Sequence, residues 1–102
     1  MAHLILWEFR PLAGREAEFE TTYGPGGDWV RFFARSREYL GTELLRDQDD
    51  PCRYFTLDRW TTREAYENFR RRHLSEYEEL DRRSGQVTAH ERPWGSFNTL
   101  DP

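Results

Sequence analysis

The sequence has little of what marks an exported, metal-bound or membrane-embedded protein. Cys52 is the single cysteine among 102 residues, which excludes an internal disulfide framework and a thiolate metal cluster. No apolar run approaches the roughly twenty residues needed to span a bilayer. The first residues also lack the basic flank and long apolar stretch of a signal peptide. We therefore expect a cytoplasmic protein that makes no contact with a membrane.

Apolar residues are also scarce, and charge of neither sign dominates. Hydrophobic residues make up 36% of the chain and charged residues 33%, with fifteen basic against nineteen acidic side chains. The basic residues are interleaved with acidic ones, which argues against a phosphate-binding surface and hence against nucleic acid as a partner. Aromatic residues reach 16%, so large rings must supply most of the core. We expect one domain over residues 1–102, with residues 98–102 as a loose tail.

The segment Tyr54–Trp60 is the strongest strand signal in the chain, being rich in aromatic and β-branched residues. Alternation directs Phe55 and Leu57 to one face of this strand. The opposite face carries Tyr54, Thr56, Asp58 and Trp60. A face that mixes rings with polar groups is typical of a pocket wall. Directly behind the strand, the pattern Thr61–Glu64 resembles a capping box and predicts the start of a helix.

The remaining elements follow from periodicity and from turn residues. Further strands are predicted at Leu4–Phe9, Tyr39–Asp47 and Val87–Phe97, the last with Pro93 at an edge or a bulge. Helices are predicted at Arg15–Tyr23 and Trp29–Arg35, with Asp28 as N-cap of the second piece, and from Thr62 to Ser84, with a kink near Ser75. This order is the βαββαβ pattern of an α+β, ferredoxin-like fold, in which two helical layers cover one face of a four-stranded antiparallel sheet.

Helices on one side leave the other face of the sheet bare. If Leu4, Leu6, Phe55 and Leu57 meet the helices, the bare face carries Ile5, Trp7, Phe9, Tyr54 and Trp60. An apolar patch of that size marks an interface or a ligand site. We therefore expect a homodimer in which the open faces cover each other and enclose an aromatic-lined cavity.

Five segments together carry a family resemblance: Leu4–Arg10, Tyr23–Trp29, Tyr39–Arg46, Tyr54–Trp60 and Gly95–Phe97. With these segments the chain resembles the antibiotic biosynthesis monooxygenase family of dimeric α+β barrels. The resemblance implies the fold above and a small aromatic molecule as partner. In the cofactor-free members a phenol is deprotonated and its anion reacts with O₂ to give a quinone, without flavin or metal.

The same resemblance ranks the branches of the superfamily. Trp60 matches the tryptophan that ends the third strand in both the monooxygenase and the haem-degrading branches. Trp7 stands where the haem-degrading branch has an asparagine, so haem degradation is the less favoured reading. The leading hypothesis is a cofactor-independent monooxygenase. The alternatives are a small-molecule binding or stress-response protein without catalysis, and a haem-binding protein.

The candidate site residues each have a structural alternative. Trp7 and Trp60 are expected to wall a flat aromatic substrate, or else to pack in the dimer core. His90 is the candidate base and Arg92 the group that holds the resulting anion, unless both are solvated edge residues. The first-strand His3 is a second possible base.

Three further residues complete the candidates. Tyr54 and Asp58 share the face of Trp60 and are placed to orient a hydroxyl group. In the alternative, Asp58 pairs with an arginine and Tyr54 packs against the partner subunit. His73 lies on the apolar stripe of the last helix, where a haem ligand would sit in the haem-binding branch, although a core or surface-boundary histidine is the favoured reading.

Overall fold

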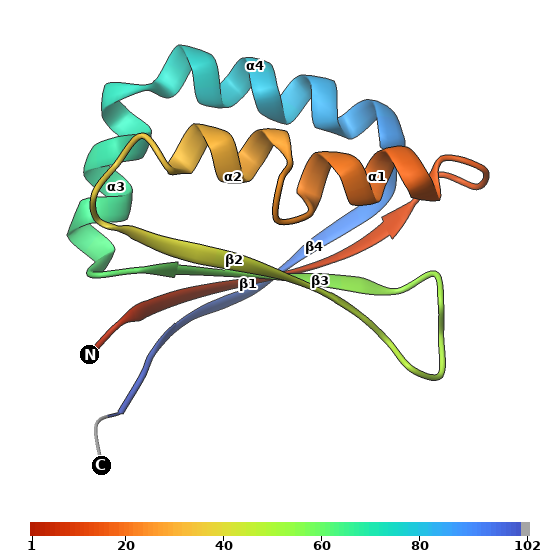
Figure 1. The fold of residues 1–102 in the computed structure, drawn as a ribbon, viewed down its shortest axis with the longest axis horizontal. Coiled ribbons are helices and arrows are strands. Elements are labelled where there is room, and N and C mark those ends of the chain that lie inside the picture. The colour runs from red at the N-terminus through yellow and green to blue at the C-terminus, as the bar shows by residue number, and fades with distance from the viewer. Residues whose placement is uncertain (101–102) are drawn as a thin grey trace.

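A computed structural model describes residues 1–100 and confirms the α+β, ferredoxin-like fold (Figure 1). Within that range each predicted helical layer is split into two helices. The elements are β1 (His3–Pro11), α1 (Glu16–Tyr23), α2 (Asp28–Phe33), β2 (Tyr39–Arg46), β3 (Tyr54–Trp60), α3 (Arg63–Arg72), α4 (Leu74–Ser84), a 3₁₀ turn (Gly85–Val87) and β4 (Thr88–Asn98). All helices lie on one side of the sheet, and α3 covers the end at which β3 finishes.

The four described strands form one antiparallel sheet in the order β2-β3-β1-β4. The predicted hairpin of β2 and β3 is confirmed, and β3 lies inside the sheet. β4 is an edge strand, and its register against β1 shifts between Leu6 and Trp7, opposite Gly95 and Pro93. Gly95 has a φ of 126° at this bulge, a conformation that side chains beyond glycine disfavour. The prediction of an edge or a bulge at Pro93 was therefore right on both counts.

Local chemistry sets the helix boundaries. Thr62 is the N-cap of α3, and its hydroxyl accepts a hydrogen bond from the Ala65 amide at 3.0 Å. α1 and α2 are separated by glycines, and a Cβ on Gly27 would lie 2.4 Å from backbone carbonyl oxygens of α1. Gly27 itself, and not Asp28, is the N-cap of α2. The helical segment after β3 breaks at His73, slightly before the kink predicted near Ser75.

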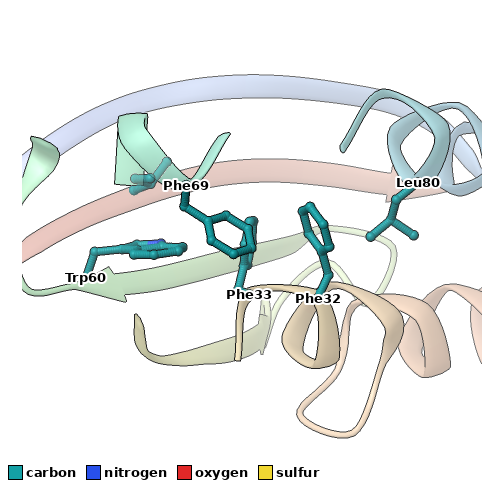
Figure 2. Close-up of a cluster of buried hydrophobic side chains, with 6 residues drawn as sticks. Phe32, Phe33, Trp60, Phe69 and Leu80 are labelled. Carbon is teal, nitrogen blue, oxygen red and sulfur yellow. The ribbon is translucent and has the colours of Figure 1, made fainter. Parts of the chain in front are cut away.

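The helices cover the sheet face opposite to the one that we took as the core side. Ile5, Phe9, Tyr54 and Trp60 are buried beneath the helices, whereas Leu4, Leu6, Phe55 and Leu57 lie on the open face. Aromatic rings bury more apolar surface between the sheet and the helices than leucine side chains do. Trp60 lies against Phe33 and Phe69 in this layer, with Phe32 and Leu80 farther along (Figure 2).

We expected residues 98–102 to form a loose tail, but hydrogen bonds hold residue 99 against the start of the chain. Asn98 ends β4, and the Thr99 amide donates to the Ala2 carbonyl at 3.0 Å. The Ala2 amide in turn donates to the Thr99 hydroxyl at 2.7 Å. The part of the predicted tail at 101–102 lies outside the described residues. Within residues 1–100, no helix has the length and apolar character needed to cross a membrane.

Candidate functional site

A cavity of about 190 Å³ lies between the covered face of the sheet and the helices. Half of its lining residues are aromatic, and six of the others are polar or charged. The lining residues are Ile5, Trp7, Phe9, Tyr23, Trp29, Phe33, Thr42, Thr56, Asp58, Tyr66, Arg70, Tyr77, Asp81 and Glu91. Aromatic walls with polar groups placed among the rings are a feature of sites for small organic ligands.

The register of β1 arranges the floor of this cavity. Ile5 pairs with Asp58 on β3, and Trp7 pairs with Thr56. On the other side of β1, Phe9 pairs with Glu91 of β4. Four residues of extended strand span roughly 13 Å, so Asp58 and Glu91 lie toward opposite ends of the floor. No cluster of three or more His, Cys, Asp or Glu suited to a metal ion occurs in the described part of the chain.

Among the carboxyl groups on the wall, Asp58 is the one whose pKa is most altered by its surroundings. The Thr42 hydroxyl donates to Asp58 Oδ1 at 2.5 Å, and the Tyr39 hydroxyl also hydrogen-bonds to Thr42. Because the single Thr42 proton goes to the carboxylate, Tyr39 must be the donor in its own bond. Burial raises the pKa of Asp58 to about 6, and the Thr42 bond opposes this shift. Asp58 can therefore take up a proton near neutral pH.

Charged groups of opposite sign lie at different parts of the cavity. The Arg70 guanidinium of α3 lies 4.6 Å from the centre of the Tyr77 ring. Asp81 of α4 and Glu91 of β4 line the wall near Phe9 and Tyr23. Burial, and then the charge of Asp81, raise the pKa of Glu91. The cavity therefore has a cation toward α3 and two carboxylates toward the start of β4.

The four predicted substrate-binding residues all lie on the covered side but have unequal access to the cavity. Trp7 and Asp58 line it. Trp60 has no exposed surface and lies outside the lining, and its indole nitrogen has no hydrogen-bond partner within residues 1–100. Tyr54 is 2% exposed, packs on Phe19 with ring centres 5.0 Å apart, and donates its hydroxyl proton to Glu20. Trp60 and Tyr54 therefore belong to the two hydrophobic clusters beside the cavity and do not line it.

His90 and Arg92, the predicted catalytic residues, share a face of β4 as expected, but it is the open face. His90 pairs with Arg10 and Arg92 with Glu8, whereas the intervening Glu91 turns to the cavity. Both predicted residues are exposed. We had assigned His90 and Arg92 to the same pocket as Trp7 and Asp58, but the two pairs lie on opposite faces of the sheet. The catalytic roles of His90 and Arg92 stay a prediction.

His73 also lies away from the cavity, at the junction of α3 and α4. Its ring nitrogen Nδ1 is 3.3 Å from Arg35 and 3.6 Å from a Glu76 carboxylate oxygen. It packs against the Phe69 ring, with centres 4.6 Å apart. His73 therefore contacts neighbouring side chains and does not line the cavity, so it would not touch a ligand bound there.

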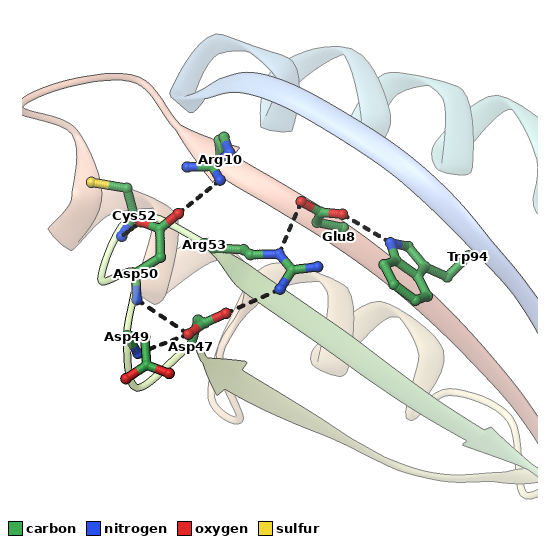
Figure 3. Close-up of polar contacts among 8 residues, drawn as sticks. All are labelled: Glu8, Arg10, Asp47, Asp49, Asp50, Cys52, Arg53 and Trp94. Carbon is green, nitrogen blue, oxygen red and sulfur yellow. Dashed lines mark hydrogen bonds and ion pairs between the residues drawn. The ribbon is translucent and has the colours of Figure 1, made fainter.

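The open face carries a polar network of its own (Figure 3). Glu8 accepts hydrogen bonds from Trp94 Nε1 at 2.9 Å and from Arg53 Nε at 3.2 Å. Arg53 also donates to Asp47 at 3.0 Å, and its guanidinium lies 4.8 Å from the centre of the Phe55 ring. The Trp94 bond, with support from Arg53, lowers the pKa of Glu8. This face is thus organised by ion pairs and not by a cavity.

Sequence reasoning missed several lining residues for different reasons. Tyr66 and Tyr77 lie in the predicted helix that ends at Ser84, and Trp29 begins another predicted helix, but none of the three was connected with the site. Identifying the covered face would have connected them. Arg70 and Glu91 belong to no motif, and their positions follow from the helix break and from the register of β4.

Comparisons with known proteins agree with this geometry. The profile of the family described as antibiotic biosynthesis monooxygenase matches residues 3–79. A search of curated proteins found no match. Among solved structures, SnoaB, a cofactor-independent oxygenase from Streptomyces nogalater, is 22% identical with a TM-score of 0.74, over 99% of this chain and 95% of that one.

Two other solved structures are similar in fold. A Bordetella bronchiseptica protein provisionally described as an antibiotic biosynthesis monooxygenase is 21% identical with a TM-score of 0.74, over 97% of each chain. A conserved protein from Methanosarcina mazei is 8% identical with a TM-score of 0.76, over 98% of this chain and 94% of that one. At these identities the likeness concerns the fold alone.

Proposed function

Because this chain belongs to the antibiotic biosynthesis monooxygenase family, we propose that its cavity binds a flat phenol and that the protein oxidises this phenol with O₂ to a quinone. The observation that carries the proposal is Asp58, a carboxyl group of raised pKa on the wall of an aromatic cavity. A general base works best when its pKa is near the operating pH. The rings of Trp7 and Trp29 provide flat surfaces for the substrate.

The reaction balances with dioxygen as the sole oxidant. Asp58 accepts the hydroxyl proton, and the electron-rich phenolate reduces O₂ and forms a carbon–oxygen bond at the ring position that carries hydrogen. Loss of water from the resulting peroxide leaves the second carbonyl. One oxygen atom thus enters the quinone, and the other leaves in water with the hydroxyl and ring hydrogens. The chain's own work is to bind, orient and deprotonate the phenol.

The hydrogen-bond chain behind Asp58 supports this role. Thr42 holds one carboxylate oxygen at 2.5 Å and is itself held by Tyr39. That arrangement fixes the orientation of the carboxyl group and leaves its second oxygen without a hydrogen-bond partner among residues 1–100. A ligand hydroxyl is a suitable donor to that oxygen.

The test is oxygen uptake with a panel of polycyclic phenols by the protein and by Asp58→Asn. We expect uptake and a quinone absorbance, and a loss of about 10² to 10⁴ in rate for the variant, the usual contribution of a general base. Asp49→Asn, on the exposed turn between β2 and β3, is the matched control and should keep the rate. His90→Ala is measured in parallel. A rate that survives Asp58→Asn but not His90→Ala would transfer the role of base to the open face.

Binding of a phenol without oxygen uptake would contradict the proposed activity and favour the alternative of a binding protein. Titration with hemin in the same assay checks the haem alternative. A Soret band abolished by His73→Ala would support it, although His73 lies outside the cavity.

We also propose that the protein is a homodimer formed through the open face of the sheet. That face exposes 42% of Leu45, 45% of Trp94 and 48% of Phe97, beside the half-buried Phe55 and Leu57. An apolar surface of this kind is typical of an interface. Sedimentation at micromolar concentration is the check, and a monomer there would contradict the proposal.

A further inference from the structure

Arg70 is a cation at the wall of the cavity that no carboxylate neutralises in the described part of the chain. Its guanidinium lies over the face of the Tyr77 ring, 4.6 Å from the ring centre. This cation–π contact holds the planar group in place but leaves its donors available. An arginine fork matches the geometry of a carboxylate, with which it forms paired, charge-assisted hydrogen bonds.

The neighbouring arginines of α3 differ from Arg70 either in having a side-chain partner or in lying away from the cavity. Arg63, on the same helix, pairs with Glu67 at 2.9 Å. Arg71 donates to Asn68. Arg72 has no ion pair within residues 1–100, but it lines a different surface depression and not the cavity. Arg70 therefore combines a free charge with access to the cavity, and Arg72 offers a matched control.

Arg70 stands where the cavity meets the outside. A groove between α3 and the β1–β4 pair shares Ile5, Trp7, Tyr66 and Arg70 with the cavity. A ligand that lies on Trp7 would therefore have a charged substituent at Arg70 without displacing the buried rings. The groove provides solvent access, which lowers the cost of keeping that charge ionised.

The opposite end of the cavity has the opposite charge. Asp81 and Glu91 line the wall near Phe9, and the mutual repulsion of their charges contributes to the raised pKa of Glu91. An anionic ligand with both ends inside would meet repulsion there and attraction at Arg70. The cavity is thus polarised along β1, and one orientation of an aromatic anion is favoured.

We infer that Arg70 is the anchor for a carboxylate on the aromatic ligand, so that the substrate class is a phenolic aromatic acid held with its carboxylate toward α3. The inference rests on the proposed function in taking the cavity as the substrate site. It adds the acidic substituent, the residue that recognises it and the orientation of the ring.

The test compares the binding of a hydroxynaphthoic acid with that of its methyl ester, which differs by one charge. Binding is followed without oxygen by the quenching of tryptophan fluorescence, since Trp7 and Trp29 line the cavity. The protein should bind the acid about tenfold more tightly than the ester, which corresponds to about 1.4 kcal/mol. Added salt should weaken binding of the acid and leave that of the ester unchanged.

Two variants locate the effect. In Arg70→Gln the preference for the acid should disappear while the ester binds as before, which also shows that the cavity remains folded. In Arg72→Gln the preference should persist. The inference is overturned if the protein binds both probes equally, if it binds neither, if Arg70→Gln keeps the preference, or if Arg72→Gln loses it to the same extent.

The result is separable from the proposed oxygenation because binding is measured in the absence of oxygen. An Arg70-dependent preference without later oxygen uptake supports the anchor and contradicts the oxygenation. Oxygen uptake from neutral phenols, with no preference for the acid, contradicts the anchor and supports the oxygenation.

Discussion

The two faces of the sheet are built from alternating residues of the same strands, yet they place carboxyl groups in opposite environments. On the covered face, burial raises the pKa of Asp58 to about 6. On the open face, Trp94 and Arg53 donate to Glu8 and lower its pKa. A carboxyl group enclosed among rings is prepared to exchange a proton, whereas one held by donors stays ionised. The contrast is consistent with both proposals, catalysis at the covered face and dimer formation through the open face.

The largest expected difference between the faces lies in their tryptophans. Trp60 is fully buried among Phe33, Tyr66 and Phe69, so Trp60→Ala should destabilise the fold by about 3 to 5 kcal/mol. Urea unfolding should show this loss at every protein concentration. Trp94→Ala should instead cause a loss of stability that changes with protein concentration, because it weakens the proposed dimer. A concentration-independent loss of equal size in both variants would remove the distinction.

Asp58→Asn should sharpen the comparison by making the protein more stable at the expense of activity. Below about pH 4 the carboxyl group is protonated in both folded and unfolded chains. Between its ordinary pKa of 3.8 and the folded value of about 6 the folded state retains the proton, so stability falls as pH rises through this window. Above it the cost is complete, at about 3 kcal/mol.

The asparagine variant avoids that cost, and we expect it to gain about 3 kcal/mol over the wild type at about pH 7.5. The gain should fall well below about 1 kcal/mol at about pH 4. Urea midpoints at the two pH values measure it, with Asp49→Asn as control. An equal effect of Asp58→Asn at both pH values would mean that the carboxyl group does not titrate in this window.

The same contrast explains what the sequence could and could not predict. Strand alternation correctly separated Phe55 and Leu57 from Asp58 and Trp60, because a period of two is a property of the strand itself. It did not tell which set meets the helices, since both sets contain large apolar residues. The sequence also predicted an apolar stripe on the last helix, but the cavity beside that helix depends on how the helices pack on the sheet.

Site residues were predictable where they followed from the strand and not where they depended on strand pairing. Trp7 and Asp58 each sit inside a regular strand, and both line the cavity. His90 and Arg92 were assigned to the pocket by their chemistry, yet the pairing of β4 with β1 turns Glu91 to the cavity instead. Register is a tertiary property that no short motif encodes.

A smaller loss of stability is expected when the hydrogen bond between Trp29 and Ser84 is removed. Trp29 Nε1 donates to Ser84 Oγ at 2.9 Å, which joins α2 to the end of α4 over the cavity. Ser84 is 2% exposed, so Ser84→Ala leaves a buried donor unpaired and should cost about 1 kcal/mol. Urea unfolding measures the loss, and Ser84→Thr, which keeps a hydroxyl group, is the control. A neutral Ser84→Ala would show that Trp29 finds another acceptor.

The smallest expected effect, and the one opposite in sign to that of Asp58, belongs to Glu8 on the open face. Because its folded pKa is depressed, Glu8 stabilises the fold above its ordinary pKa of 4.5, and this contribution is lost as pH falls through the folded value. Glu8→Gln should therefore be less stable than the wild type near neutral pH, and the gap should narrow in acid. Thermal unfolding across that pH range measures the gap. A gap that widens in acid would reverse the contrast between the two faces, since Glu8 would then respond to pH as Asp58 does.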